Sequence, residues 1–160
     1  MGASPSIVGT NPTTAIEDNN YISYAKGDVC GETIYDELLR LNFNMIQGQG
    51  ILDAEGFKDN QNNESFTTLV EGIMKDSIYI IICISKKTTA SYHQAIEMNA
   101  ALDSKKMIVY VMTDKDYTPQ NTHYLYGVVK RNVWLPGYNE TTIEMSLKTL
   151  ASMCDISIRV

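Results

Sequence analysis

Two continuous apolar runs constrain the fold of this chain more than any other feature. Residues 78–84 read IYIIICI and residues 107–112 read MIVYVM. A strand with one solvated face alternates apolar and polar residues, whereas a strand covered on both faces does not alternate. The two runs therefore predict central strands of a parallel sheet that has helices on both faces.

Shorter apolar segments at 21–24, 43–46 and 133–135 supply three further strands. Between the strands, apolar residues recur with helical spacing in three stripes. Ser91 with Gln94, and Thr141 with Glu144, have the spacing of capping boxes at helix starts. Five strands alternating with helices predict a flavodoxin-like α/β fold with strand order 2-1-3-4-5. The stripes are Ile34, Leu38 and Leu41; Phe66, Leu69, Val70, Ile73 and Met74; and Ile143, Leu147, Leu150, Ala151 and Cys154.

The 160 residues fit one domain, predicted at 20–157 behind a flexible leader at 1–19. A net charge of −6 disfavours nucleic acid as a partner. Cys30, Cys83 and Cys154 form no zinc-type spacing, so reduced thiols in the cytoplasm are expected. No stretch is long and apolar enough for a transmembrane segment. Gly2 lies in a myristoylation pattern, although a chance or cloning glycine would look the same.

The predicted strand order places ligands at the carboxyl ends of the first and third strands, beside the loops at 25–28 and 85–90. The residues there exclude several site types. Neither strand ends in the acidic residues of a phospho-receiver, and no phosphate-binding P-loop or G-x-S-x-G nucleophile elbow occurs. Gly48-Gln49-Gly50 does not form a dinucleotide fingerprint, and no helical pattern opens behind it. His93 and His123 are too few for a metal site, and surface or helix-end positions are expected for both.

Three segments resemble Toll/interleukin-receptor (TIR) domains. Residues 21–26, YISYAK, resemble the F-I-S-Y opening strand of that family and the basic residue after it. Residues 78–85, followed by a short loop and Ser91, resemble its third strand and the start of the next helix. Glu97 falls where the family places a glutamate. The resemblance spans about residues 20–154 and implies the TIR fold.

Residues 52–59, LDAEGFKD, resemble the NAD-cleaving branch of the family that is linked to SAM and armadillo domains. That resemblance implies a self-associating nucleosidase of immune or cell-death signalling, with NAD+ or NADP+ as substrate and no further cofactor. Glu97 would be its catalytic carboxylate. Three departures from the family are His93 in place of a tryptophan, Ala25 in place of a second basic residue, and no Arg-Asp-x-x-Pro-Gly loop. The implied substrate-binding residues are Tyr24, Ala25, Lys26, Phe57, Ser91, Tyr92 and His93.

Cleavage of NAD+ needs few groups, because nicotinamide leaves as a neutral molecule and requires no proton. One carboxylate can then hold the ribose and stabilise the oxocarbenium-like transition state. Lys26 could pair with the pyrophosphate, and the rings of Phe57, Tyr92 and His93 offer flat faces for the bases.

Other interpretations of the same residues stay open. Glu97 could be a solvated residue on a helix whose Ala95, Ile96, Ala100 and Leu102 face the sheet. The chain could be a non-catalytic TIR scaffold acting by homotypic association, with a mobile loop at 48–64 that reorganises on assembly. A deoxyribosyltransferase-like enzyme also places a glutamate on an α/β sheet.

Overall fold

The computed structural model describes the backbone of residues 19–57 and 64–159, and their side chains except those of residues 54 and 154–159. Residues 1–18 of the predicted leader, including Gly2, and the side chain of Cys154 lie outside this part of the chain. No helix among the described residues is long and apolar enough to cross a membrane.

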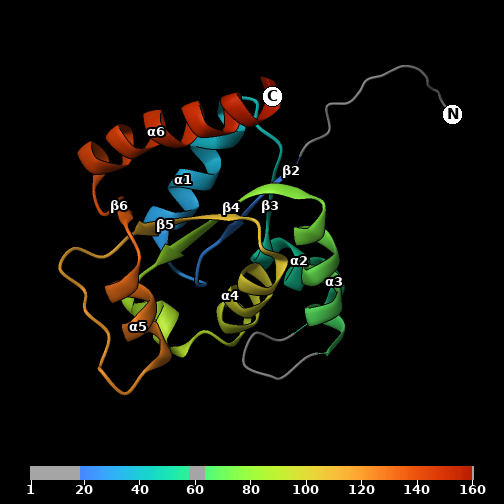
Figure 1. Ribbon diagram of the computed structural model, residues 1–160, viewed down its shortest axis with the longest axis vertical. Coiled ribbons are helices and arrows are strands. Elements are labelled where there is room, and N and C mark those ends of the chain that lie inside the picture. Colours follow the sequence, from blue (N-terminus) through green and yellow to red (C-terminus); the bar gives the residue numbers. More distant parts are fainter. Residues whose placement is uncertain (1–18, 58–63, 160) are drawn as a thin grey trace, which may run out of the picture.

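A five-stranded parallel sheet forms the centre of the molecule (Figure 1). Its order is β3-β2-β4-β5-β6, and every neighbouring pair is parallel. This is the predicted 2-1-3-4-5 order. The strands are β2 (Asn19–Ser23), β3 (Met45–Gln47), β4 (Ser77–Ile84), β5 (Met107–Met112) and β6 (Trp134–Pro136). Since β2 begins at Asn19, it takes in the last residue of the predicted leader.

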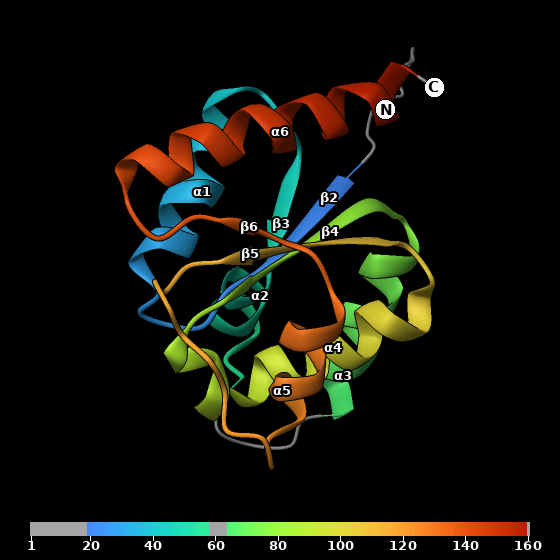
Figure 2. The same ribbon diagram turned by 60° about the vertical axis from the view of Figure 1, so that its left-hand side comes forward.

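Helices cover both faces of the sheet, as Figures 1 and 2 show. On one face lie α1 (Val29–Arg40) and α6 (Glu140–Arg159). On the other lie α2 (Gly48–Glu55), α3 (Glu64–Lys75), α4 (Tyr92–Ser104) and α5 (Tyr124–Arg131). A short 3-10 helix, η2 (Lys86–Ala90), joins β4 to α4.

The continuous apolar run of β4 is explained by two separate cores. Ile80, Ile82 and Ile84 pack with Phe66 and Met98 on the side of α2 to α5. Ile81 and Cys83 pack with α1 and α6 on the opposite side. Because successive residues of a strand point to opposite faces, both sets have to be apolar.

Four local predictions were wrong or only half right. The segment 48–64 was expected to be a loop, but α2 occupies its first half and opens directly at Gly48. The N-terminal cap of α6 is Asn139, whose side chain accepts a hydrogen bond from the Thr142 N–H at 2.8 Å, rather than Thr141. Leu102 is 54% exposed instead of facing the sheet, and Leu41 and Leu69 are also exposed. Ser91 caps α4 as predicted, but Gln94 does not return the bond and reaches the sheet instead.

Candidate active site at the carboxyl end of the central strands

Glu97 lies inside the molecule, on the face of α4 that packs against the sheet. Its side chain is 0% exposed, so the expectation of a solvated helical glutamate is wrong. The Tyr21 hydroxyl donates a hydrogen bond to Oε2, and the Ser23 hydroxyl donates to Oε1 at 2.8 Å. Tyr21 and Ser23 are two residues apart on β2, so both side chains point to the same face. An isolated buried carboxylate would be costly, and these hydrogen bonds offset that cost.

Gln94 aligns the hydroxyl of Ser23. Its side-chain amide donates to Ser23 Oγ at 3.0 Å and to the Cys83 carbonyl at 2.9 Å. Because Ser23 Oγ already accepts from Gln94, its own proton is directed at Glu97. The other amide atom, Oε1 of Gln94, is buried and accepts no hydrogen bond from the described residues. A buried acceptor therefore remains available close to the carboxylate.

His93 lies one helical turn before Glu97 and is 1% exposed, so the prediction of a surface or helix-end position is wrong for it. Nε2 lies 3.1 Å from the Tyr24 carbonyl and 3.6 Å from Glu97 Oε1. A carbonyl oxygen can only accept, so Nε2 carries a proton, and Nδ1 can accept from Ser91 Oγ at 3.2 Å. The imidazole thus joins the end of β2 to the start of α4. His123, by contrast, does cap a helix, α5.

The start of α2 closes over the carboxylate. A Cβ atom built on Gly48 would lie 2.0 Å from Glu97 Oε2 and 3.0 Å from the Tyr21 hydroxyl oxygen. Only a residue without a side chain fits this contact. Gln47 fixes the helix start, because its side chain accepts from the Gly50 N–H at 3.1 Å. Gly48 is itself buried, and in this conformation it separates Glu97 from solvent.

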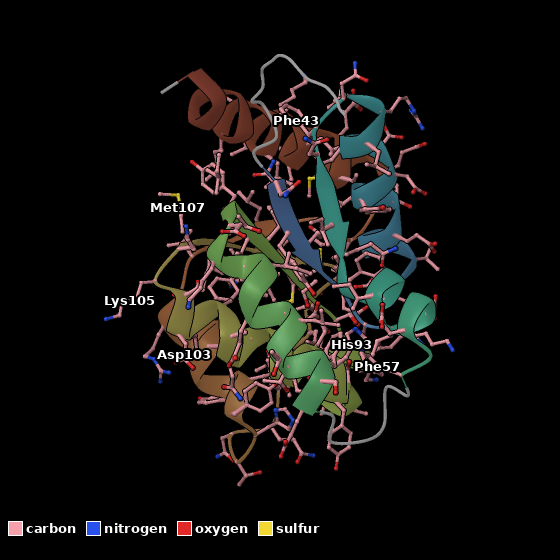
Figure 3. All side chains as sticks on the ribbon, turned by 90° about the vertical axis from the view of Figure 1, so that its right-hand side faces the viewer. Phe43, Phe57, His93, Asp103, Lys105 and Met107 are labelled. Carbon is pink, nitrogen blue, oxygen red and sulfur yellow. The ribbon has the colours of Figure 1, made fainter. Side chains whose placement is uncertain are left out.

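A chain of aromatic contacts continues from His93 to the end of α2. The Phe66 ring meets the His93 ring edge-on with centroids 6.3 Å apart, and Phe57 meets Phe66 in the same way at 6.3 Å. Figure 3 shows His93 and Phe57 at the same end of the molecule. Phe57 therefore reaches the site through Phe66.

The remaining predicted residues divide into two groups. Tyr24 and Ala25 are buried, but the Tyr24 ring packs on Tyr35 in the core beneath α1, and Tyr24 meets His93 only through its carbonyl. Lys26 and Tyr92 lie on the surface, with Tyr92 53% exposed. The structure thus brings Glu97, His93 and Ser91 together and leaves Lys26 and Tyr92 apart from them at the surface.

A second lysine lies at the same end of the sheet. The side chain of Lys87, in η2, runs along Gly27, where a Cβ would lie 3.4 Å from Lys87 Cε and 3.6 Å from Nζ. Gly27 directly follows Lys26. Lys26 and Lys87 therefore lie in neighbouring segments that follow the carboxyl ends of β2 and β4.

A cavity of about 880 Å³ opens farther along this edge, between η2 and the segment after β5. Its lining includes Lys86, Asp114, Tyr117 and His123, but not Glu97. Its walls are joined by hydrogen bonds between Thr89 and Tyr117, and between the Lys86 N–H and Asp114. It lies beyond the strand pair where ligands of this fold bind, so we do not assign it to the Glu97 site.

Sequence reasoning missed Tyr21, Ser23, Gln94 and Gly48. The period-two spacing of the two hydroxyl residues in the first strand was a usable signal, because it places both on one face of the sheet. Gln94 was assigned only to helix capping. Nothing in the sequence indicated that Gly48 would meet Glu97, since that contact joins segments about fifty residues apart.

Comparisons with known proteins bear on the fold. No protein-family model and no curated protein matches the chain. Among solved structures, the chain is similar to the crystal structure of the RPS4 and RRS1 TIR domain heterodimer, with a TM-score of 0.52. The alignment covers 85% of this chain and 97% of that chain at 10% sequence identity. With its five-stranded parallel sheet in 2-1-3-4-5 order, this chain has the fold of a TIR domain.

Proposed function

We propose that this chain is an NAD(P)+ nucleosidase that cleaves the bond between nicotinamide and ribose, with Glu97 as its catalytic carboxylate. One observation carries the proposal: a fully buried carboxylate, held by the hydroxyls of Tyr21 and Ser23, lies where ligands bind in this strand order. Keeping a carboxylate buried costs free energy, and side chains kept at such a cost in a ligand-binding position are candidates for chemistry.

The reaction suits a site with one carboxylate. The pyridinium of NAD+ is a cation that leaves as neutral nicotinamide, so no acid has to protonate it. Glu97 would accept a hydrogen bond from a ribose hydroxyl and stabilise the positive charge that develops on the sugar. Water then adds to give ADP-ribose, or the adenine adds to give a cyclic product. The open acceptor on Gln94 would suit a second ribose hydroxyl.

Lys26 and Lys87 would hold the pyrophosphate. The family's second basic residue after the Ser-Tyr pair is Ala25 here, which removes one positive charge. Lys87, lying along Gly27, would supply a charge from the neighbouring loop. Two ammonium groups at the carboxyl ends of the strands are suited to a phosphate pair as point charges.

Substrate can reach Glu97 only if the start of α2 moves away, because Gly48 lies against Oε2. We infer that the conformation described here is closed and that self-association of TIR domains, in cytoplasmic immune or cell-death signalling, favours an open one. In the open form the faces of His93 and Phe57 would become available to the nicotinamide ring. The open state would then be a property of the assembly, and activity should rise more than linearly with protein concentration.

The proposal is tested by nicotinamide release from NAD+ at several protein concentrations. Glu97→Gln keeps the size of the side chain and removes its charge, and Glu71→Gln makes the same change on the exposed face of α3. We expect release by the native chain and by Glu71→Gln, and a loss of at least about a hundredfold in Glu97→Gln. Equal release by all three folded proteins would rule out Glu97.

A non-catalytic TIR scaffold is the alternative, and the closed position of Gly48 over Glu97 favours it. The solved structure to which the chain is similar is a heterodimer of TIR domains, and the alternative extends such association to this chain. Concentration-dependent association in light scattering, with no nicotinamide release from the associated protein, would support the scaffold. Cleavage of nucleosides without cleavage of NAD+ would instead favour a deoxyribosyltransferase-like activity.

A further inference from the structure

Tyr21 occupies the position that is a phenylalanine in the F-I-S-Y pattern. The hydroxyl that distinguishes the two residues donates its hydrogen bond to Glu97 Oε2. Tyr21 is 0% exposed, so water does not compete for this bond. A hydrogen bond to an ionised group away from water is among the stronger ones in proteins.

The Tyr21 hydroxyl acts only as a donor toward the carboxylate. Burial, followed by the negative charge of Glu97, raises the pKa of the Tyr21 phenol well above its ordinary value of 10.0. The phenol therefore keeps its proton at every pH at which the protein would be assayed. Ser23 is likewise directed toward Glu97, because its oxygen accepts from Gln94.

We propose that the Tyr21 hydroxyl is a positioning group that fixes the orientation of the Glu97 carboxylate and favours its ionised form. Donation to a carboxylate stabilises the anion relative to the acid. With phenylalanine at this position, Glu97 would ionise at a higher pH and would be free to rotate. The consequence for catalysis rests on the proposed function, whereas the effect on ionisation does not.

Other groups around Glu97 also enter its ionisation. From β2 these are Tyr21 and Ser23; from α4 it is His93, with Nε2 at 3.6 Å. From α2 it is Gly48, which has no side chain to titrate. Among these groups, His93 is the titratable side chain that Tyr21→Phe leaves in place, so the titration is repeated in a His93→Gln background to separate the two contributions.

The test is a carbon-13 NMR titration of the Glu97 carboxyl, identified as the signal that is missing from Glu97→Gln. Tyr21→Phe removes one oxygen atom, and Tyr110→Phe makes the same change at a buried tyrosine of the same core, on β5. Loss of a hydrogen bond to a charged group corresponds to an upward shift of about one pH unit in the midpoint. We expect that shift in Tyr21→Phe, and no shift in Tyr110→Phe. The acid limb of the pH profile of nicotinamide release should move upward with it.

An unchanged midpoint in Tyr21→Phe, or an equal shift in Tyr110→Phe, would overturn the proposal. If Tyr21→Phe does not fold, 3-fluorotyrosine at position 21 replaces it: the more acidic phenol is a stronger donor and must lower the midpoint. The titration needs no turnover. A shifted midpoint in a chain that releases no nicotinamide would therefore support the role of Tyr21 toward Glu97 and refute the nucleosidase.

Discussion

Replacing Gly48 with alanine would drive a methyl group into the Glu97 carboxylate. The new Cβ would lie 2.0 Å from Oε2 and 2.7 Å from Cδ, whereas real Cβ atoms essentially never come closer than 3.0 Å to another heavy atom. The start of α2 would have to retreat by about 1 Å or more, since Tyr21 and Ser23 hold the carboxylate from the other side. The substitution therefore destabilises the closed position of α2 in particular.

The size of the effect follows from the overlap. Overpacking of a well-packed site typically costs about 1–3 kcal/mol. The higher helix propensity of alanine offsets part of this cost. It stabilises a helix interior by at most about 1 kcal/mol relative to glycine, and the first helical position by less. A net loss of about 2 kcal/mol from the closed position raises the population of the open one about 30-fold.

Hydrogen exchange measured by mass spectrometry reports this population directly. We expect backbone amides of α2 to exchange about 30-fold faster in Gly48→Ala than in the native chain, because opening precedes exchange. Gly50→Ala is the matched control on the same helix. The three heavy atoms nearest to its Cβ would all belong to the Gln47 side chain, the nearest at 3.3 Å, so α2 should exchange no faster than in the native chain.

Native-like exchange in Gly48→Ala, or equally fast exchange in Gly50→Ala, would refute the idea that Gly48 closes the site. Nicotinamide release from the same samples answers a different question. Faster exchange accompanied by faster release links the opening to catalysis. Faster exchange with no release would still support the role of Gly48 in closing the site, but it would count against Glu97 as a catalytic residue.

Three further predictions concern groups around the site. Burial raises the pKa of Asp28 above its ordinary 3.8, and this effect outweighs the hydrogen bonds from Thr113 and Gly31, which lower the pKa. Since the folded state then holds the Asp28 proton more tightly than the unfolded state, ionisation of Asp28 lowers the stability of the fold. Urea titrations should show the native chain losing stability relative to Asp28→Asn as the pH rises from about 4 to 7, and a constant difference would contradict this. Gln94→Ala removes the hydrogen bonds to the Cys83 carbonyl and to Ser23 and should cost about 2–3 kcal/mol in urea unfolding, whereas a cost below about 0.5 kcal/mol would show that these bonds contribute little. Lys87→Ala should raise KM for NAD+ about threefold to tenfold with kcat nearly unchanged, and an unaltered KM would remove Lys87 from the pyrophosphate site.

The architecture follows from patterns that are visible in the sequence. The apolar run at 107–112 matches β5 residue for residue, and the run at 78–84 lies within β4. The strand order was predictable because continuous apolar strands must be covered on both faces, and connections in such sheets are short and right-handed. The resemblance to TIR domains singled out Glu97 as a candidate catalytic residue, and the strand order predicted the edge of the sheet where it lies.

The environment of Glu97, in contrast, depends on contacts between elements that are distant in the sequence. The periodicity of α4 predicted exposure, because a glutamate among alanines and an isoleucine looks like the polar side of an amphipathic helix. Its burial depends on the hydroxyls of Tyr21 and Ser23, which lie more than seventy positions earlier in the chain. The closing contact of Gly48 likewise depends on how α2 packs against α4. Local patterns report which face of an element is apolar, whereas the partners of a buried charge are brought together only when the elements pack.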